Sequence, residues 1–255
     1  MNLKSIFFLR AIVFSASVVV AFGQESRVRS IEINKGQVIS LITSKPLPGT
    51  DELRSEYFRN VFPPAQALGF ESQGSFRIRS VKLHGSKADP HVGEGNLMSF
   101  FTWPDGASIE RFRRETPNWN ELEKSRRDIW EELRIIRMTS LKNAELNFHS
   151  DKIYRIVFVW LNDENPEHLK RYQKAMKATR EELGARYVIQ WDKVDYYHSF
   201  IEPSNVPDLA WIIEWPSSQA HDDYLASEAF SKNVQLFMSG VSRFEAYETE
   251  FLFGN

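Results

Sequence analysis

Two stretches of the sequence, "FFTWPDG" at residues 100–106 and "IIEWPSS" at residues 212–218, are nearly the same. Each begins with apolar residues typical of a buried strand and passes through Trp-Pro into the polar start of a helix. Proline fits there because the first turn of a helix needs no N–H from it. The candidate N-caps are Asp105, Ser217 and Ser218. The recurrence predicts two copies of one structural unit.

The sequence around the second stretch predicts a complete unit. "KIYRIVFVWL" at residues 152–161 is apolar on both faces, which indicates a strand that is covered on both sides. A helix is expected with Asn165 as its cap and Pro166 at its first position, and it is expected to end at Gly184. The remaining elements are a strand at 185–200, the Trp-Pro strand, a helical segment at 218–240 and a final strand at 243–253.

The first copy shows the same order less regularly. A strand at 36–43 precedes a helix that starts near Thr50, and Pro63 and Pro64 are expected to kink or split this helix. The other expected elements are a strand at 75–85, the Trp-Pro strand, a helix at 118–135 and a final strand at 137–148. The order β-α-β-β-α-β in each copy is the ferredoxin-like pattern.

Helices can cover only one face of such a four-stranded sheet, yet both faces are apolar in this sequence. We therefore expect the two sheets to pack face to face. The predicted fold class is α+β, with two ferredoxin-like repeats that form one barrel inside a single chain. Repeat one is expected at residues 24–149 and repeat two at residues 150–255.

The residues of repeat two also resemble a known superfamily. Residues 154–190 together with 209–240 are similar to a family of small domains of uncharacterised activity within the dimeric α+β barrel superfamily. The resemblance implies an intrachain pseudo-dimeric α+β barrel. Relatives in this superfamily include cofactor-free monooxygenases, lactone isomerases and haem proteins of the chlorite dismutase type. No catalytic motif of those groups can be matched residue by residue to this chain.

The N-terminus has the layout of a secretory signal peptide. Lys4 and Arg10 precede a run of apolar residues at 11–22, which is shorter than the roughly 20 residues that span a bilayer. We expect cleavage after Gly23, with Ala21 as the second choice, and export to the periplasm or the medium. The alternative is an uncleaved membrane anchor.

Composition excludes several classes of protein. There is no cysteine, so neither disulfides nor a lipoprotein anchor can form. The formal net charge of −2 gives no basic excess for nucleic acid. Phosphate-binding glycine loops, zinc helices and nucleophile elbows are also missing. We expect no metal, no haem or other cofactor, no nucleic-acid or membrane partner, and a soluble monomer with internal pseudo-twofold symmetry.

Five residues are candidates for a site. His84 and His198 each end the second strand of a repeat, where a histidine beside an apolar pocket can act as a catalytic acid or base; the alternative is an exposed strand end. Trp103 and Trp215 could line a ligand cavity between sheet and helices or could be core residues. Arg186 could meet an anionic ligand or form a surface ion pair.

The other histidines are weaker candidates. His221 lies beside Asp222 and Asp223, so a wet environment is expected for it.

Three functions remain open at this point. The favoured one is binding of a small apolar or aromatic molecule. The second is a cofactor-free monooxygenase or isomerase that uses His198 or His84 as its acid or base. The third is a structural or interaction protein with a filled barrel. The position of any cavity, and the groups that line it, would distinguish these interpretations.

Overall fold

A computed structural model describes residues 26–85, 97–200 and 206–253. The predicted signal peptide therefore lies outside the described residues. Repeat one consists of β2 (Val38–Pro46), α1 (Asp51–Ala67), β3 (Glu71–His84), β4 (Leu97–Trp103), α2 (Gly106–Glu115), α3 (Trp119–Ile129) and β5 (Trp130–Thr139). Repeat two consists of β7 (Ile153–Leu161), α4 (His168–Ala175), α5 (Lys177–Glu182), β8 (Arg186–Trp191), β9 (Tyr196–Ser199), β10 (Leu209–Trp215), α6 (Ser218–Ala226), α7 (Glu228–Gly240) and β11 (Val241–Leu252).

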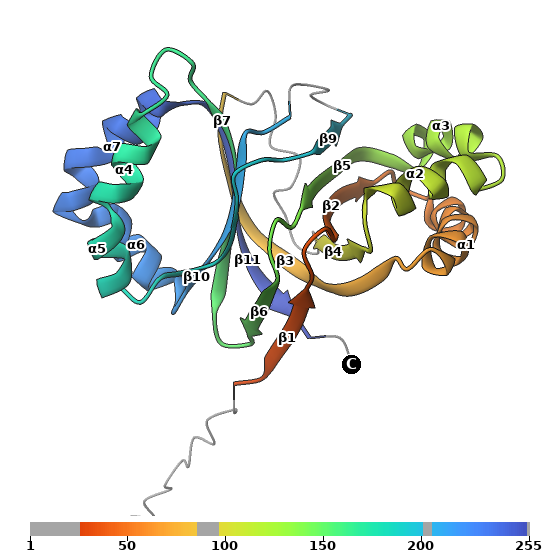
Figure 1. Cartoon of the computed structure of the whole chain (residues 1–255), viewed down its shortest axis with the longest axis horizontal. Helices are drawn as coiled ribbons and strands as arrows, with labels where there is room; N and C mark the ends of the chain where they lie inside the picture. Colours follow the sequence, from red (N-terminus) through yellow and green to blue (C-terminus); the bar gives the residue numbers. More distant parts are fainter. Residues whose placement is uncertain (1–25, 86–96, 201–205, 254–255) are drawn as a thin grey trace, which may run out of the picture.

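The sheet has the same strand order in both repeats, β3-β4-β2-β5 in the first and β8-β10-β7-β11 in the second. Strand β11 also pairs with β3, and β5 pairs with β9. Because β8 and β9 are two parts of the strand expected at 185–200, these pairings close the sheet into a barrel. The helices of the two repeats lie on opposite outer sides of it (Figure 1). The structure confirms the predicted pseudo-dimeric α+β barrel.

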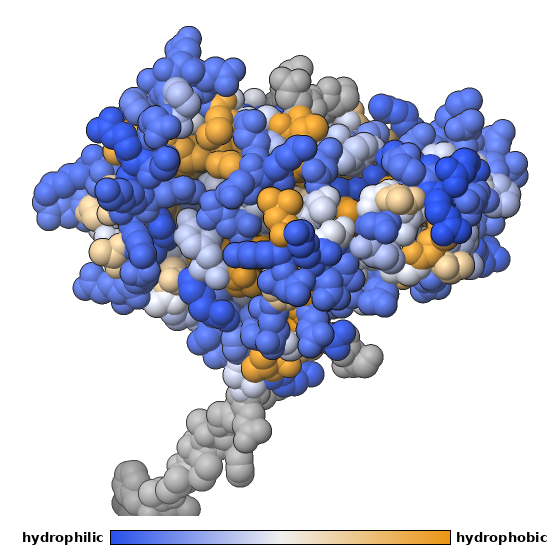
Figure 2. Space-filling view, in the orientation of Figure 1, coloured by the Kyte–Doolittle hydropathy of each residue, from blue (hydrophilic) through white to orange (hydrophobic). Residues whose placement is uncertain are grey.

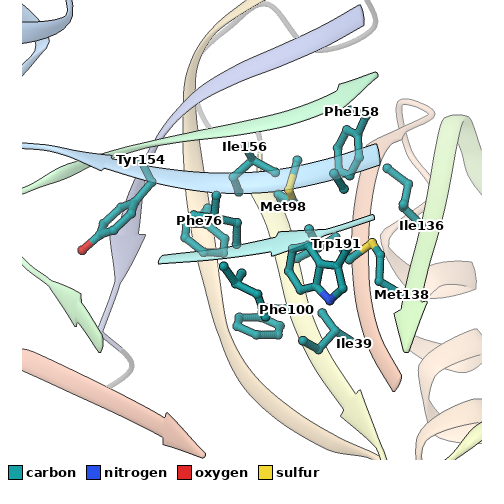
Figure 3. Packing of buried hydrophobic residues seen from close by; sticks show 14 of the residues in the cluster. Ile39, Phe76, Met98, Phe100, Ile136, Met138, Tyr154, Ile156, Phe158 and Trp191 are labelled. Carbon is teal, nitrogen blue, oxygen red and sulfur yellow. The ribbon is translucent and has the colours of Figure 1, made fainter. Parts of the chain in front are cut away.

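Apolar side chains from both repeats fill the barrel. Figure 3 shows residues of β2, β4 and β5 meeting residues of β7 and β8, among them Ile39, Phe100, Ile156, Phe158 and Trp191. A separate two-stranded ribbon, β1 (Val28–Ile33) with β6 (Ala144–His149), contributes to the same cluster. Hydrophilic residues dominate the molecular face in Figure 2, as expected when the apolar sheet faces are covered.

Charged residues are buried inside the same barrel. Arg134 of β5 and Glu245 of β11 are both fully buried, and Arg134 Nη1 lies 2.5 Å from Glu245 Oε1. Glu132 accepts a hydrogen bond from Arg134 Nε at 3.2 Å, and Arg243 Nη2 donates to Glu245 at 2.5 Å. The sequence Glu-x-Arg in β5 thus faces Arg-x-Glu in β11, so the two repeats are complementary in charge.

Two element predictions in repeat one were wrong in detail. The helix expected at 118–135 ends at Ile129, and β5 begins at Trp130. The final strand expected at 137–148 is divided, because residues 144–149 form β6 and pair with β1. Glu132 and Arg134 appear in the sequence as the charged side of a helix, but they are fully buried and pair with each other.

Helix boundaries also differ from expectation. Helix α4 begins at His168 and not at Pro166, and the residue at its cap position is Glu167 and not Asn165. Helix α1 continues through Pro63 and Pro64 without being split, and the Thr50 hydroxyl donates to backbone carbonyls instead of capping the helix. The segment 218–240 divides into α6 and α7 because the Ser227 hydroxyl caps the second helix.

We predict that residues 150–255 expressed alone do not form a folded monomer. Without repeat one, β7 would expose the side chains that now face the barrel, which are Tyr154, Ile156, Phe158 and Trp160. Each such side chain contributes roughly 1.5 to 3 kcal/mol when buried. We expect the fragment to pair with itself or to aggregate. Size-exclusion chromatography with light scattering, alongside residues 24–255 as the reference, measures this. A soluble, well-folded monomer would contradict the facing-sheet architecture.

Candidate functional site

The repeated Trp-Pro motif positions one side of a cavity in each repeat. Pro104 packs on Gly69 and Pro216 packs on Gly184, and these glycines have φ values of +82° and +75°. A Cβ atom added at either glycine would come within 2.5 or 2.9 Å of the proline ring. The glycine after the first helix of each repeat therefore fits the proline just before the N-cap of α2 or α6, and the tryptophan before that proline is buried.

The cavity in repeat two has a volume of about 350 Å³ and lies between the sheet and α4, α6 and α7. We call it the repeat-two cavity. Aromatic and aliphatic side chains make up most of its wall, and they include Leu169, Tyr172, Tyr187, Trp211, Trp215, Tyr224, Phe230, Phe237 and Phe244. Its volume is within the range of small-molecule sites, roughly 300 to 1,000 Å³.

A buried polar group lies at the wall of this cavity. Arg155 of β7 forms an ion pair with Glu248 of β11 at 2.5 Å. Its Nη2 also donates to Nδ1 of His221 at 3.0 Å. Because Nδ1 accepts this hydrogen bond, the proton of the neutral imidazole is on Nε2. Burial, together with the charge of Arg155, lowers the pKa of His221 to about 3. His221 is therefore a neutral hydrogen-bond donor at physiological pH.

Two tyrosines form a second polar pair. The hydroxyl oxygens of Tyr172 and Tyr224 lie 2.6 Å apart. Burial raises the pKa of both phenols. They are therefore protonated at neutral pH and can exchange one hydrogen bond between themselves while offering another to a ligand.

The expectation that His221 is solvent-exposed was wrong. The side chain is 9% exposed, and its ring centroid is 5.1 Å from that of Trp215. Helix α6 places His221 and Tyr224, three residues apart, on its inward face, whereas Asp222 and Asp223 are exposed. The spacing of a histidine and a tyrosine at i and i+3 after Trp-Pro was the signal in the sequence that could have identified this site.

Repeat one has a cavity of about 310 Å³ between its sheet and α1, α2 and α3, and Trp103 lines it. We call it the repeat-one cavity. At the offset of 112 residues that relates the two Trp-Pro motifs, Ile109 and Phe112 correspond to His221 and Tyr224. Both are buried beside Trp103. The histidine and tyrosine chemistry is thus specific to repeat two.

Neither of the two predicted histidines lines the repeat-one or the repeat-two cavity. His84 stacks on Phe244 with ring centroids 5.7 Å apart. His198 lies on β9 opposite Ile135, where burial and then the charge of Arg126 lower its pKa. In the sheet, β4, β2 and β5 separate the two histidine strands, so these residues do not form one site.

Arg186 is held by a carboxylate. Its Nε and Nη2 atoms donate to the two carboxylate oxygens of Glu214 at 2.7 and 2.9 Å. The ion-pair interpretation of Arg186 is therefore correct. Its role toward an anionic ligand stays a prediction.

The described residues hold neither a metal-binding cluster nor a membrane-spanning helix. No group of three histidine, aspartate or glutamate side chains is placed to hold a metal ion among them. Within the same ranges, none of the helices is long and apolar enough to cross a membrane.

The comparisons with known proteins identify the fold. No family model and no curated protein matches the chain. An anthrone oxidase-like protein of known structure is 13% identical, with 88% of this chain and 95% of that chain covered and a TM-score of 0.52. A proposed monooxygenase from Fusobacterium nucleatum (8% identity, 87% and 94% covered, TM-score 0.40) and a chlorite dismutase mutant from Candidatus Nitrospira defluvii (8%, 86% and 93%, 0.43) are also similar. The chain has the dimeric α+β barrel fold, with both repeats in one polypeptide.

Because His221 is buried and neutral, we predict that the folded protein loses stability in acid. Its pKa is about 3 in the folded protein and about 6.5 in an unfolded chain, so the unfolded state gains a proton first as the pH falls. Stability from this group is complete above pH 6.5 and decreases toward pH 3. In urea unfolding at pH 7 and pH 4, the wild type should lose about 2 to 3 kcal/mol more than His221→Asn. Equal losses in both proteins would show that His221 is accessible to protons.

Proposed function

We propose that the repeat-two cavity binds a planar, mainly aromatic small molecule that carries an acceptor oxygen. The observation that carries this proposal is an aromatic cavity with a neutral histidine at its wall. Buried donors there lack an acceptor among the described residues, and they include Trp215 Nε1 and Gln173 Nε2. An oxygen of the ligand would satisfy such donors, while its rings would contact the aromatic wall.

His221 suits an oxygen that gains negative charge. Arg155 fixes the imidazole through Nδ1, which leaves the Nε2–H as the donor, and Glu248 balances the charge of Arg155. A neutral imidazole held in this way stabilises an oxyanion without transferring its proton. A carbonyl or phenol oxygen is therefore the favoured polar group of the ligand.

The same donor supports a second candidate, a cofactor-free monooxygenase. Solvent water takes a proton from a carbon conjugated to a carbonyl, and the negative charge that develops on the carbonyl oxygen would be stabilised by His221. The carbanion forms a C–O bond with dioxygen, and the resulting peroxide anion takes up the released proton. The same carbon then loses its second proton as the O–O bond breaks, so that anthrone and O₂ give anthraquinone and water. The similarity to an anthrone oxidase-like protein over nearly the whole chain favours this reaction as a test. His84 and His198 do not line this cavity, so the candidate depends on His221.

We predict that anthrone raises the melting temperature of the purified mature protein. Replacing His221 with Leu removes one buried hydrogen bond, worth roughly 1 kcal/mol or somewhat more, and should weaken anthrone binding about tenfold. The matched control is His198→Asn, at a strand-end histidine on β9 that does not line this cavity, and this variant should bind normally. Isothermal titration measures affinity, and an oxygen electrode measures consumption of O₂.

The outcomes separate the two candidates. Binding without O₂ consumption supports the binding protein, and His221-dependent O₂ consumption supports the oxygenase. Absence of anthrone binding, together with no aromatic molecule in native mass spectra of the protein isolated from its source, would contradict both.

A further inference from the structure

The repeat-one cavity contains an arginine without a carboxylate partner. Arg137 of β5 lines this cavity, and its guanidinium lies 4.7 Å from the ring centroid of Tyr196. Its Nε atom is buried and has no hydrogen-bond partner among the described residues. No aspartate or glutamate in the described ranges forms an ion pair with this half-buried side chain, although each of the two fully buried arginines of repeat one, Arg126 and Arg134, lies within 4 Å of a glutamate. Removing part of a cation from water without a counter-charge costs free energy unless a ligand neutralises it.

The pseudo-twofold symmetry shows what repeat one lacks. Trp103 pairs with Val38, and Trp215 pairs with Ile153. Two residues further along the central strands β2 and β7 are Ser40 and Arg155, which are therefore counterparts. Ser40 pairs with Arg137 of β5, and Arg155 pairs with Glu248 of β11. Repeat two therefore has an arginine and a glutamate at this place, whereas repeat one has a serine and an arginine.

The serine is also unsatisfied. Ser40 is 1% exposed, lines the same cavity, and its hydroxyl has no partner among the described residues. Because Ser40 and Arg137 are neighbours across β2 and β5, two donors without an acceptor lie together on the sheet side of the cavity.

The surrounding charge is positive. Arg126 of α3 lines the cavity, donates to the hydroxyl of Tyr57 at 2.7 Å, and has one carboxylate, that of Glu123, at 3.5 Å. Burial and the charges of Arg113 and Arg126 lower the pKa of Arg137, while Glu110 has a smaller opposite effect. An anion at this place would relieve the repulsion between these guanidinium groups.

The rest of the cavity is apolar and aromatic. Its wall includes Phe58, Phe62, Phe70, Phe101, Trp103 and Trp119. The rings of Phe70 and Phe101 stack with centroids 4.7 Å apart, so flat apolar surfaces already form part of the wall. A small inorganic anion would leave this surface without contacts, whereas an aromatic ring joined to an anionic group would use both parts.

We infer that the repeat-one cavity binds an aromatic carboxylate, with the carboxylate on Arg137 and Ser40 and the ring between the aromatic side chains. The guanidinium can donate two hydrogen bonds to one carboxylate, a geometry that lysine does not offer. This site is separate from the repeat-two cavity and does not depend on the function proposed there.

Isothermal titration of the full mature protein with 2-naphthoate tests the inference. The neutral probe 2-naphthamide has the same ring system and should bind at least about tenfold more weakly, because a charged hydrogen-bonded contact is lost. Arg137→Met should weaken 2-naphthoate binding at least about tenfold and leave 2-naphthamide binding unchanged. Ser40→Ala should have a smaller effect in the same direction.

Two controls define the result. Arg114→Met removes one exposed arginine charge and should bind 2-naphthoate like the wild type. Arg137→Met should keep its melting temperature, since no protein carboxylate loses a partner. If Arg137→Met does not fold, 2-naphthoate binding is measured with Arg137→Gln in its place. The inference is overturned if 2-naphthoate fails to bind, binds no better than 2-naphthamide, or binds the Arg137 variants like the wild type.

Discussion

The ion pair between Arg134 and Glu245 joins the two halves of the barrel. These residues occupy the same place in the two repeats. Arg134 pairs with Thr43 of β2 and Glu245 pairs with Phe158 of β7, and Thr43 and Phe158 are at equivalent positions of the two central strands. A symmetric pair of identical domains would bring two like charges to this place. A tandem chain can place opposite charges there, and both residues are then fully buried at a separation of 2.5 Å. A buried charge needs such a partner, so this contact favours the native pairing of the repeats over other pairings.

Two unlike repeats can also carry two unlike cavities. At the same place on the sheet, repeat two has the pair Arg155 and Glu248 while repeat one has Ser40 and Arg137. In the repeat-two cavity, Arg155 is paired with Glu248 and lies beside the neutral His221. In the repeat-one cavity, Arg137 has no carboxylate partner among the described residues. The two cavities therefore offer different hydrogen-bond donors: His221 suits a neutral oxygen of a ligand, and Arg137 suits an anionic one. The packed apolar side chains inside the barrel support the two sheets on which these cavities lie.

The sequence was sufficient for the fold because its evidence is local and repeated. Trp-Pro occurs twice, and β7 is apolar on both faces, which indicates directly that both faces of the sheet are covered. It was insufficient where a charge is buried through a distant partner. Glu132 and Arg134 resemble an exposed helix side until β11 is known to lie opposite. His221 was misjudged from its chain neighbours, and the unpaired state of Arg137 can be seen only once the strands are in register.

A double-mutant cycle on Arg134 and Glu245 is the most direct test that the two repeats depend on this contact. The free energy of unfolding would be measured by urea for the wild type, Arg134→Met, Glu245→Gln and the double variant. Each single change leaves a buried charge with a weaker partner and should cost about 3 to 5 kcal/mol. The double variant should cost less than the sum, with a coupling energy of about 2 kcal/mol or more. Additivity within about 0.5 kcal/mol would contradict the account.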